Sequence, residues 1–150
     1  MGGTLPMLLT TGAGFLVAVL WFDLMFDVQA RRLDDADGEA RLTSIADYYR
    51  RVTIEAYPAN RLIGLVMLIT VAASVVQLVR GPAGRARALV AVLLVAVPVV
   101  LAATRVLPNA IRLGARTDTL PVQRELARAI WRDHVCCVIA ILAFLALQVY

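Results

Sequence analysis

Two acidic residues at the end of an apolar run are the first candidates for chemistry in this sequence. Asp23 and Asp27 lie in the stretch FDLMFDVQARR, which closes the apolar segment Leu5–Phe22. A carboxylate close to lipid costs free energy unless it is hydrated, paired or neutralised. The two acids therefore either cap a membrane helix at the water boundary or belong to a site.

His134 is the single histidine of the chain, and imidazole is the side chain that exchanges protons near neutral pH. It is the second candidate for a catalytic base beside Asp23, and a structural histidine at a helix interface is the alternative. The adjacent Cys136 and Cys137 would point about 100° apart on a helix. Because a metal site needs three or four ligands, we read both cysteines as packing residues and expect neither a metal nor a cofactor.

The composition indicates a membrane protein. Hydrophobic residues make up 61% of the 150 residues and the mean hydropathy is +0.77, whereas a soluble domain has roughly 45–50% apolar residues. Four stretches contain no Asp, Glu, Lys, Arg or His: Leu5–Phe22, Leu62–Val79, Ala88–Thr104 and Val135–Tyr150. At 1.5 Å per residue each nearly crosses a hydrocarbon core of roughly 30 Å. Four buried helices of a soluble protein are disfavoured, because such helices need polar faces.

The predicted fold is therefore all-α: a four-helix transmembrane bundle with one or two amphipathic interfacial helices on one side. Residues 1–150 form a single integral membrane domain, with spans at about 5–26, 61–79, 88–105 and 133–150. Pro98 in the third span predicts a kink, which could open a cavity.

The connections between the spans are unequal. A short Pro-Gly turn joins the middle two spans, and the two long connections lie on the opposite membrane side. In the first of them, Leu42, Ile45, Tyr49 and Val52 recur with helical spacing, which predicts an amphipathic helix at about 40–56 facing the bilayer or the bundle. In the second, Pro121 begins a helix that runs unbroken into the last span and is longer than the core is thick.

The arginines indicate an orientation in the cell membrane. All basic residues are Arg, with twelve in the long connections and three at positions 80, 85 and 87. Because basic loops stay in the cytoplasm, we expect a multi-pass protein with both termini outside and the long loops cytoplasmic. The net charge of +4 is explained by such residues, so we expect no nucleic-acid partner.

The polar ends of all four spans meet on the side of the long loops. We predict that Asp23 pairs with Arg105 or Arg61 inside the bundle, whereas Asp27 lies nearer water with Arg31 one turn away. Charged helix ends at an interface would produce the same pattern without a site. The predicted ligand-binding set comprises Asp23, Asp27, Tyr57, Asn60, Arg61, Arg105, Asn109, Arg128, Trp131 and His134.

Two short motifs carry a family resemblance. PAN at 58–60 and RAIWRDH at 128–134 resemble a Pro-x-Asn element beside a span, and an Arg/Trp…His stretch entering the last span. Both elements occur in small four-span bacterial membrane proteins related to anthrone oxygenase. The resemblance implies a four-span fold and an oxygenase-like activity that needs no cofactor.

Three functions follow from these observations. The first is a binding protein whose polar pocket holds a small amphipath such as a lipid, quinone or phenolic compound, with Arg61 and Arg105 meeting an anionic or carbonyl group. The second is an oxygenase-like membrane enzyme with His134 or Asp23 as its base. The third is a structural or accessory subunit. The expected partners are membrane lipid, a small amphipathic ligand, and a second copy or another membrane protein.

Overall fold

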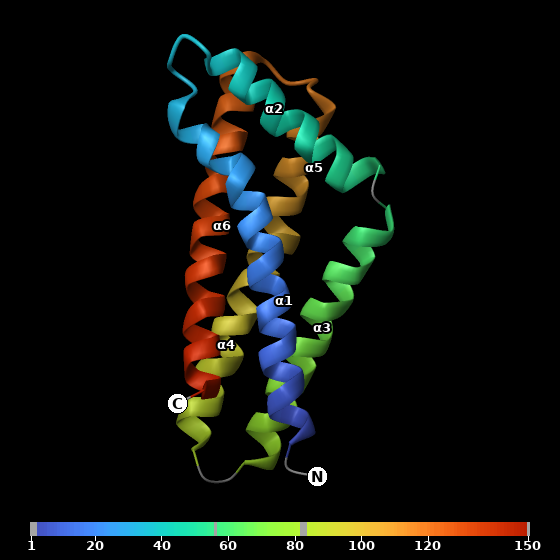
Figure 1. Cartoon of the computed structure of the whole chain (residues 1–150), viewed down its shortest axis with the longest axis vertical. Helices are drawn as coiled ribbons and strands as arrows, with labels where there is room; N and C mark the ends of the chain where they lie inside the picture. Colours follow the sequence, from blue (N-terminus) through green and yellow to red (C-terminus); the bar gives the residue numbers. More distant parts are fainter. Residues whose placement is uncertain (1–2, 56, 82–83, 150) are drawn as a thin grey trace.

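All regular structure in the described chain is helical (Figure 1). The computed structural model describes residues 3–55, 57–81 and 84–149, and the side chains of residues 57–59 lie outside that description. The helices are α1 (Thr4–Asp27), α2 (Gly38–Arg50), α3 (Tyr57–Arg80), α4 (Arg85–Leu101), α5 (Leu107–Ala115) and α6 (Leu120–Val149). A 3₁₀ segment (Val28–Arg32) follows α1, and π-helical segments (Arg51–Glu55 and Ala102–Val106) follow α2 and α4.

Four long apolar helices form a bundle, as the sequence predicts. The candidate membrane spans are Thr4–Arg32, Asn60–Arg80, Arg85–Ala115 and Leu120–Val149. Helices α1 and α4 each contact both α3 and α6, so the four helices close a ring. Both ends of the chain lie at the same end of the bundle as the turn between α3 and α4 (Figure 1). In that turn Gly84 has φ of +92°, a conformation that glycine adopts without strain.

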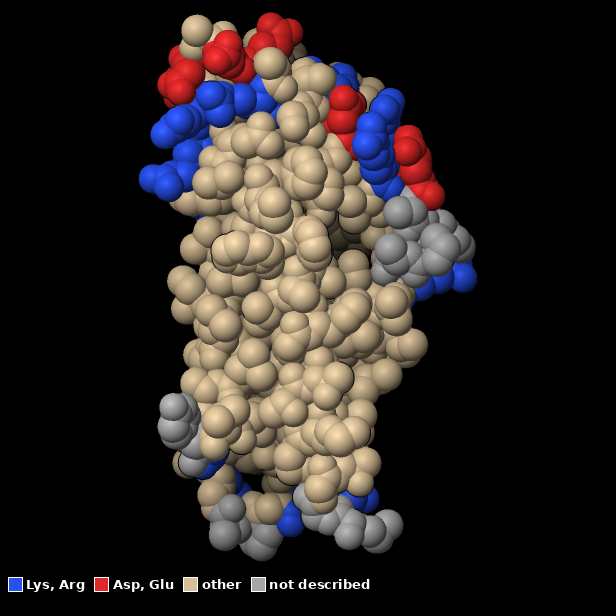
Figure 2. Space-filling view, viewed as in Figure 1, with Lys and Arg blue, Asp and Glu red and all other residues tan. Residues whose placement is uncertain are grey.

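The interior of the bundle is packed with small and branched apolar side chains. Leu9, Ala13 and Leu16 of α1 meet Val95 of α4 and Phe144 of α6 in one buried cluster. The larger apolar side chains on the outer faces are exposed, which suits contact with lipid. Figure 2 shows the result on one face: a broad belt without charged residues, with basic residues toward both ends and acidic residues toward the upper end alone.

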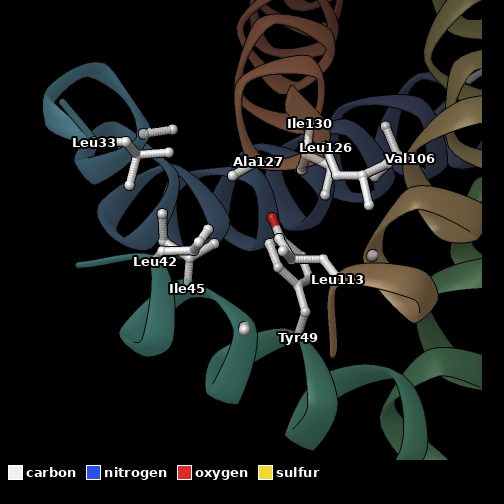
Figure 3. Packing of buried hydrophobic residues seen from close by; sticks show 12 residues of the cluster. Leu33, Leu42, Ile45, Tyr49, Val106, Leu113, Leu126, Ala127 and Ile130 are labelled. Carbon is white, nitrogen blue, oxygen red and sulfur yellow. The ribbon is translucent and has the colours of Figure 1, made fainter. Parts of the chain in front are cut away.

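The amphipathic helix α2 covers one end of the bundle, which we call the capped end. Leu42, Ile45 and Tyr49 of its apolar stripe are buried, with Leu42 and Ile45 near Leu33 and Tyr49 directed toward α6 (Figure 3). Val52, the fourth member, lies beyond the end of α2 and is half-buried. The stripe therefore faces the bundle, which decides between the two orientations that the sequence allowed. The α-helix ends at Arg50, earlier than predicted, and the chain continues as the π-helical segment Arg51–Glu55.

Pro98 lies inside α4, where it removes one backbone hydrogen-bond donor. Four residues later the helix widens into the π-helical segment Ala102–Val106, and then continues as α5. The kink that the sequence predicts at Pro98 stays a prediction, and the structure shows a local change of helical pitch beginning four residues after it. Such π-helical turns are rare and often border functional sites.

The contact between α2 and α5 depends on Gly114. A Cβ at this position would lie 2.8 Å from the backbone nitrogen of Arg50 and 3.0 Å from its Cα, so Gly114→Ala forces the two helices apart. We expect a loss of about 1–3 kcal/mol, seen as a lower thermal unfolding midpoint in detergent. Gly14→Ala is the matched control, because a Cβ there meets nothing within 4 Å. Equal midpoints for the two variants would contradict the close packing of α2 on α5.

Candidate functional site

Asp27 is the centre of a buried polar cluster at the capped end. Its side chain is 0% exposed. The hydroxyl of Tyr49 donates a hydrogen bond to Oδ1 of Asp27 at 2.6 Å, and Nδ1 of His134 lies 2.6 Å from Oδ2. Since an ionised carboxylate only accepts, this arrangement assigns a proton to Nδ1 of His134. Three helices, α1, α2 and α6, therefore meet at one carboxyl group.

Asp23 occupies the same face of α1 one turn earlier. The hydroxyl of Tyr48 donates to its Oδ1 at 2.6 Å, while its Oδ2 lies 3.8 Å from Nε2 of His134. That second distance is too long for a hydrogen bond, so Oδ2 of Asp23 can accept one from a third group, and Nε2 of His134 can do so when the imidazole is neutral. We refer to Asp23, Asp27, Tyr48, Tyr49 and His134 as the Asp–Tyr–His cluster.

The two tyrosines act as donors because their hydroxyls stay protonated. Burial raises the pKa of Tyr49 well above its ordinary value, and the charges of Asp27 and Asp23 raise it further. Burial and the charge of Asp23 likewise raise the pKa of Tyr48. The Tyr48 ring is also fixed by stacking on Phe26, with 4.1 Å between the ring centroids.

A cavity of about 580 Å³ begins at this cluster and extends between the long helices. Its polar end is formed by Asp23, Tyr49, Thr53, Asn60 and His134. Its remaining wall is almost entirely apolar and includes Leu16, Ile63, Met67, Val95, Pro98 and Ile141. No arginine belongs to the described wall. Figure 2 shows a hollow in the apolar belt, just below the charged end.

The structure brings together part of the predicted ligand-binding set. Asp23, Asn60 and His134 line the cavity, and Asp27 lies directly behind it. Arg128 and Trp131 line a separate outer groove, and Arg105 and Asn109 lie outside the cavity wall. Arg61 follows Asn60 on α3 and is exposed, while the side chain of Tyr57 is outside the described residues.

The structure corrects two expectations for the acids. Arg105 forms an ion pair with Asp133 at 3.0 Å and not with Asp23, whose Oδ1 accepts a hydrogen bond from the Tyr48 hydroxyl. The alternative pairing of Asp23 with Arg61 stays a prediction. Asp27, expected nearer water beside Arg31, is the more buried of the two acids, since Asp23 is 13% exposed. The physical reason is that α2 covers the end of α1, so proximity to the helix end does not bring hydration.

Sequence reasoning missed Tyr48, Tyr49 and Thr53 as members of the site. One signal was present: Tyr49 belongs to the apolar stripe of α2, and a buried tyrosine hydroxyl needs a hydrogen-bond partner. Thr53 and Asn60 are joined by a bond from the Asn60 side-chain amide to the Thr53 carbonyl at 3.2 Å. That contact depends on how the chain folds back between α2 and α3, which local patterns do not specify.

No known protein family, curated protein or solved structure matches the chain. The fold and the composition define an all-α protein with four candidate membrane-spanning helices. In the described part of the chain, no group of three or more His, Cys, Asp and Glu is arranged to hold a metal ion. The polar side chains that line the cavity carry carboxylate, imidazole, phenol, hydroxyl, thiol and amide groups.

The contacts of Asp23 predict a specific pattern of energetic coupling. In double-mutant cycles of thermal stability in detergent, Asp23→Asn should couple to Tyr48→Phe by about 1–3 kcal/mol, the range for hydrogen bonds to charged groups. Asp23→Asn and Arg105→Gln should be additive, whereas Arg105→Gln should couple to Asp133→Asn. Coupling of Asp23 to Arg105 with none to Tyr48 would refute the geometry described.

The raised tyrosine pKa values predict an alkaline titration. Unfolded tyrosines ionise near pH 10, whereas Tyr48 and Tyr49 hold their protons in the folded protein. Their contribution to stability is therefore complete below about pH 10 and falls as the pH rises further. Phenolate absorbance should show that Tyr48→Phe and Tyr49→Phe leave the step near pH 10 unchanged. Loss of amplitude in that step would mean that these phenols are hydrated.

Proposed function

We propose that the protein binds a small membrane-soluble amphipath in the cavity, with a hydrogen-bond-donating head at the Asp–Tyr–His cluster. The observation that supports this proposal is that a single cavity has a long apolar part and a polar end. Ligand sites of this size are usually apolar with a few placed polar groups. The orientation proposed from the arginines would set the capped end, and with it the head of the ligand, at the cytoplasmic face.

The polar end favours a donor head over an anionic one. Oδ2 of Asp23 accepts a hydrogen bond, Nε2 of His134 accepts one when the imidazole is neutral, and the carboxylate of Asp27 lies behind them. An anionic head would meet this negative charge without a described arginine in the wall. The hydroxyl of a phenol or a quinol donates its one proton to one of these acceptors, whereas an anionic or carbonyl head has no proton to donate. The proposed ligand class therefore narrows from lipid-, quinone- or phenol-like compounds to compounds with a hydroxyl head, such as phenols and quinols. In this proposal His134, which lines the cavity, contacts the head of the ligand, and Arg105, which does not line it, takes no part.

A second candidate function is an acid–base enzyme of the oxygenase-like sort. The observation that favours it is the pairing of His134 with Asp27, since a carboxylate on Nδ1 orients an imidazole and leaves Nε2 as a base. A hydroxyl head bound beside Nε2 could pass its proton to that nitrogen. The motif resemblance at 58–60 and 128–134 supports the same reaction class.

The test is ligand-dependent stabilisation of the protein in nanodiscs of neutral lipid. A long-chain alkylphenol should raise the unfolding midpoint, and an alkylbenzene of the same chain length should raise it less. Gly64→Leu places a side chain at the cavity wall where Gly64 has open space, and should abolish the difference. Asp23→Asn should reduce it at least several-fold, whereas Asp47→Asn, an exposed acid outside the cavity, should not.

Equal stabilisation by both compounds, in wild type and in Gly64→Leu alike, would refute binding in the cavity. The enzymatic alternative makes one further claim. Turnover of the bound phenol should disappear in His134→Gln while stabilisation by the phenol persists. A bound phenol that is recovered unchanged from the wild-type protein leaves binding as the function.

A further inference from the structure

A second hollow lies on the outer surface of the capped end, between the 3₁₀ segment, α5 and α6. It has a volume of about 820 Å³ and shares no lining residue with the cavity. Its polar wall is strongly basic: Arg31, Arg112, Arg128 and Arg132 face a single acid, Glu125. Trp131 and the apolar residues Ala30, Val122, Leu126 and Ala129 complete it. We call this the arginine groove.

Two of the four guanidinium groups are already engaged. Arg128 lies 2.6 Å from a carboxylate oxygen of Asp34, and Arg112 lies 2.9 Å from one of Asp118. Neither of these two carboxylates lines the groove. The charge available to a ligand comes from the other two arginines.

Arg31 and Arg132 form no ion pair within the described part of the chain. Arg31 lies over the ring of Trp131, with its guanidinium carbon 5.8 Å from the ring centroid. A cation held against an indole face keeps its outer edge free to donate hydrogen bonds. Arg132 follows Trp131 on α6 and is exposed. The groove thus presents two planar donors beside one amphipathic ring.

The depth of the groove along α6 matches a membrane interface. From Trp131 to Val149 the helix rises about 27 Å at 1.5 Å per residue, close to the thickness of a hydrocarbon core of roughly 30 Å. Tryptophan is enriched at the level of the lipid headgroups, where its ring is apolar and its N–H is polar. The arginines beside it therefore lie where lipid phosphates lie.

We propose that the arginine groove binds the phosphate of an anionic phospholipid, held by Arg31 and Arg132, with its glycerol region against Trp131 and the apolar wall. Guanidinium groups bind phosphate with paired hydrogen bonds. A free phosphate would use the basic half of the groove alone and leave the apolar half without a function. A zwitterionic lipid would bring its ammonium group against the four arginines. The inference uses none of the cavity residues and is independent of the proposed function.

The test compares lipids on the purified full chain in mild detergent by native mass spectrometry. Phosphatidylglycerol should bind at least five-fold more tightly than phosphatidylcholine of the same acyl composition. The preference should disappear in the double variant Arg31→Gln/Arg132→Gln and be reduced but not lost in Arg31→Lys/Arg132→Lys, which keeps the charge and loses the paired hydrogen bonds. The matched control is Arg32→Gln/Arg51→Gln, which removes the same charge from exposed arginines outside the groove. Unfolding midpoints of all variants check that each chain is folded.

The outcomes separate the possible sources of binding. If the control double variant loses the preference for phosphatidylglycerol as much as the groove double variant does, the lipid is attracted diffusely to a basic surface. This result would overturn the proposal. Retention of the preference in Arg31→Gln/Arg132→Gln would place the lipid elsewhere and also overturn it. Inorganic phosphate that displaces phosphatidylglycerol at equal concentration would show that the groove takes a free anion. Selective loss in the groove variant alone supports the lipid.

Discussion

A carboxylate buried among apolar helices has to find its hydrogen-bond donors inside the protein, and this constraint organises the capped end. Asp27 is reached by a hydroxyl from α2 and an imidazole nitrogen from α6. Neither donor can be withdrawn without leaving a buried acceptor unsatisfied, which costs several kcal/mol for a charged group. Asp27 therefore connects the three helices at one point. Its hydrogen bonds, together with the apolar packing of Leu42 and Ile45, determine the position of α2 over the bundle.

The position of α2 in turn forms the polar end of the cavity. Tyr49 lines the cavity from the last turn of α2, and Thr53 does so from the π-helical segment that follows. Ala102, Ala103 and Val106 of the other π-helical segment also line the cavity. Both changes of helical pitch thus border the same space. A wider helical turn shifts the side chains that follow it around the axis, which redirects the wall of the cavity.

The fold was largely predictable because its signals are local. Apolar runs mark the four spans, and the stripe through Leu42, Ile45 and Tyr49 marks the capping helix. Of the site, Asp23 and His134 were predictable as unusual residues for their positions. Their partners were not, because the hydroxyls of Tyr48 and Tyr49 reach the acids across a long-range contact between α2 and α1. From the sequence alone, an acid near a helix end is expected to be hydrated, because the sequence does not show that another helix covers that end. This explains the error for Asp27.

The hollow in the apolar belt has a consequence for how a ligand would be selected (Figure 2). A molecule reaching the cavity through that opening would first dissolve in the bilayer and then diffuse sideways to the protein. Its local concentration would be set by its partition coefficient, so a site of modest intrinsic affinity would fill when the aqueous concentration is low. The membrane itself would act as the first selectivity filter, by rejecting water-soluble phenols and sugars, and the cluster at Asp23 would discriminate only among the lipophilic compounds that remain.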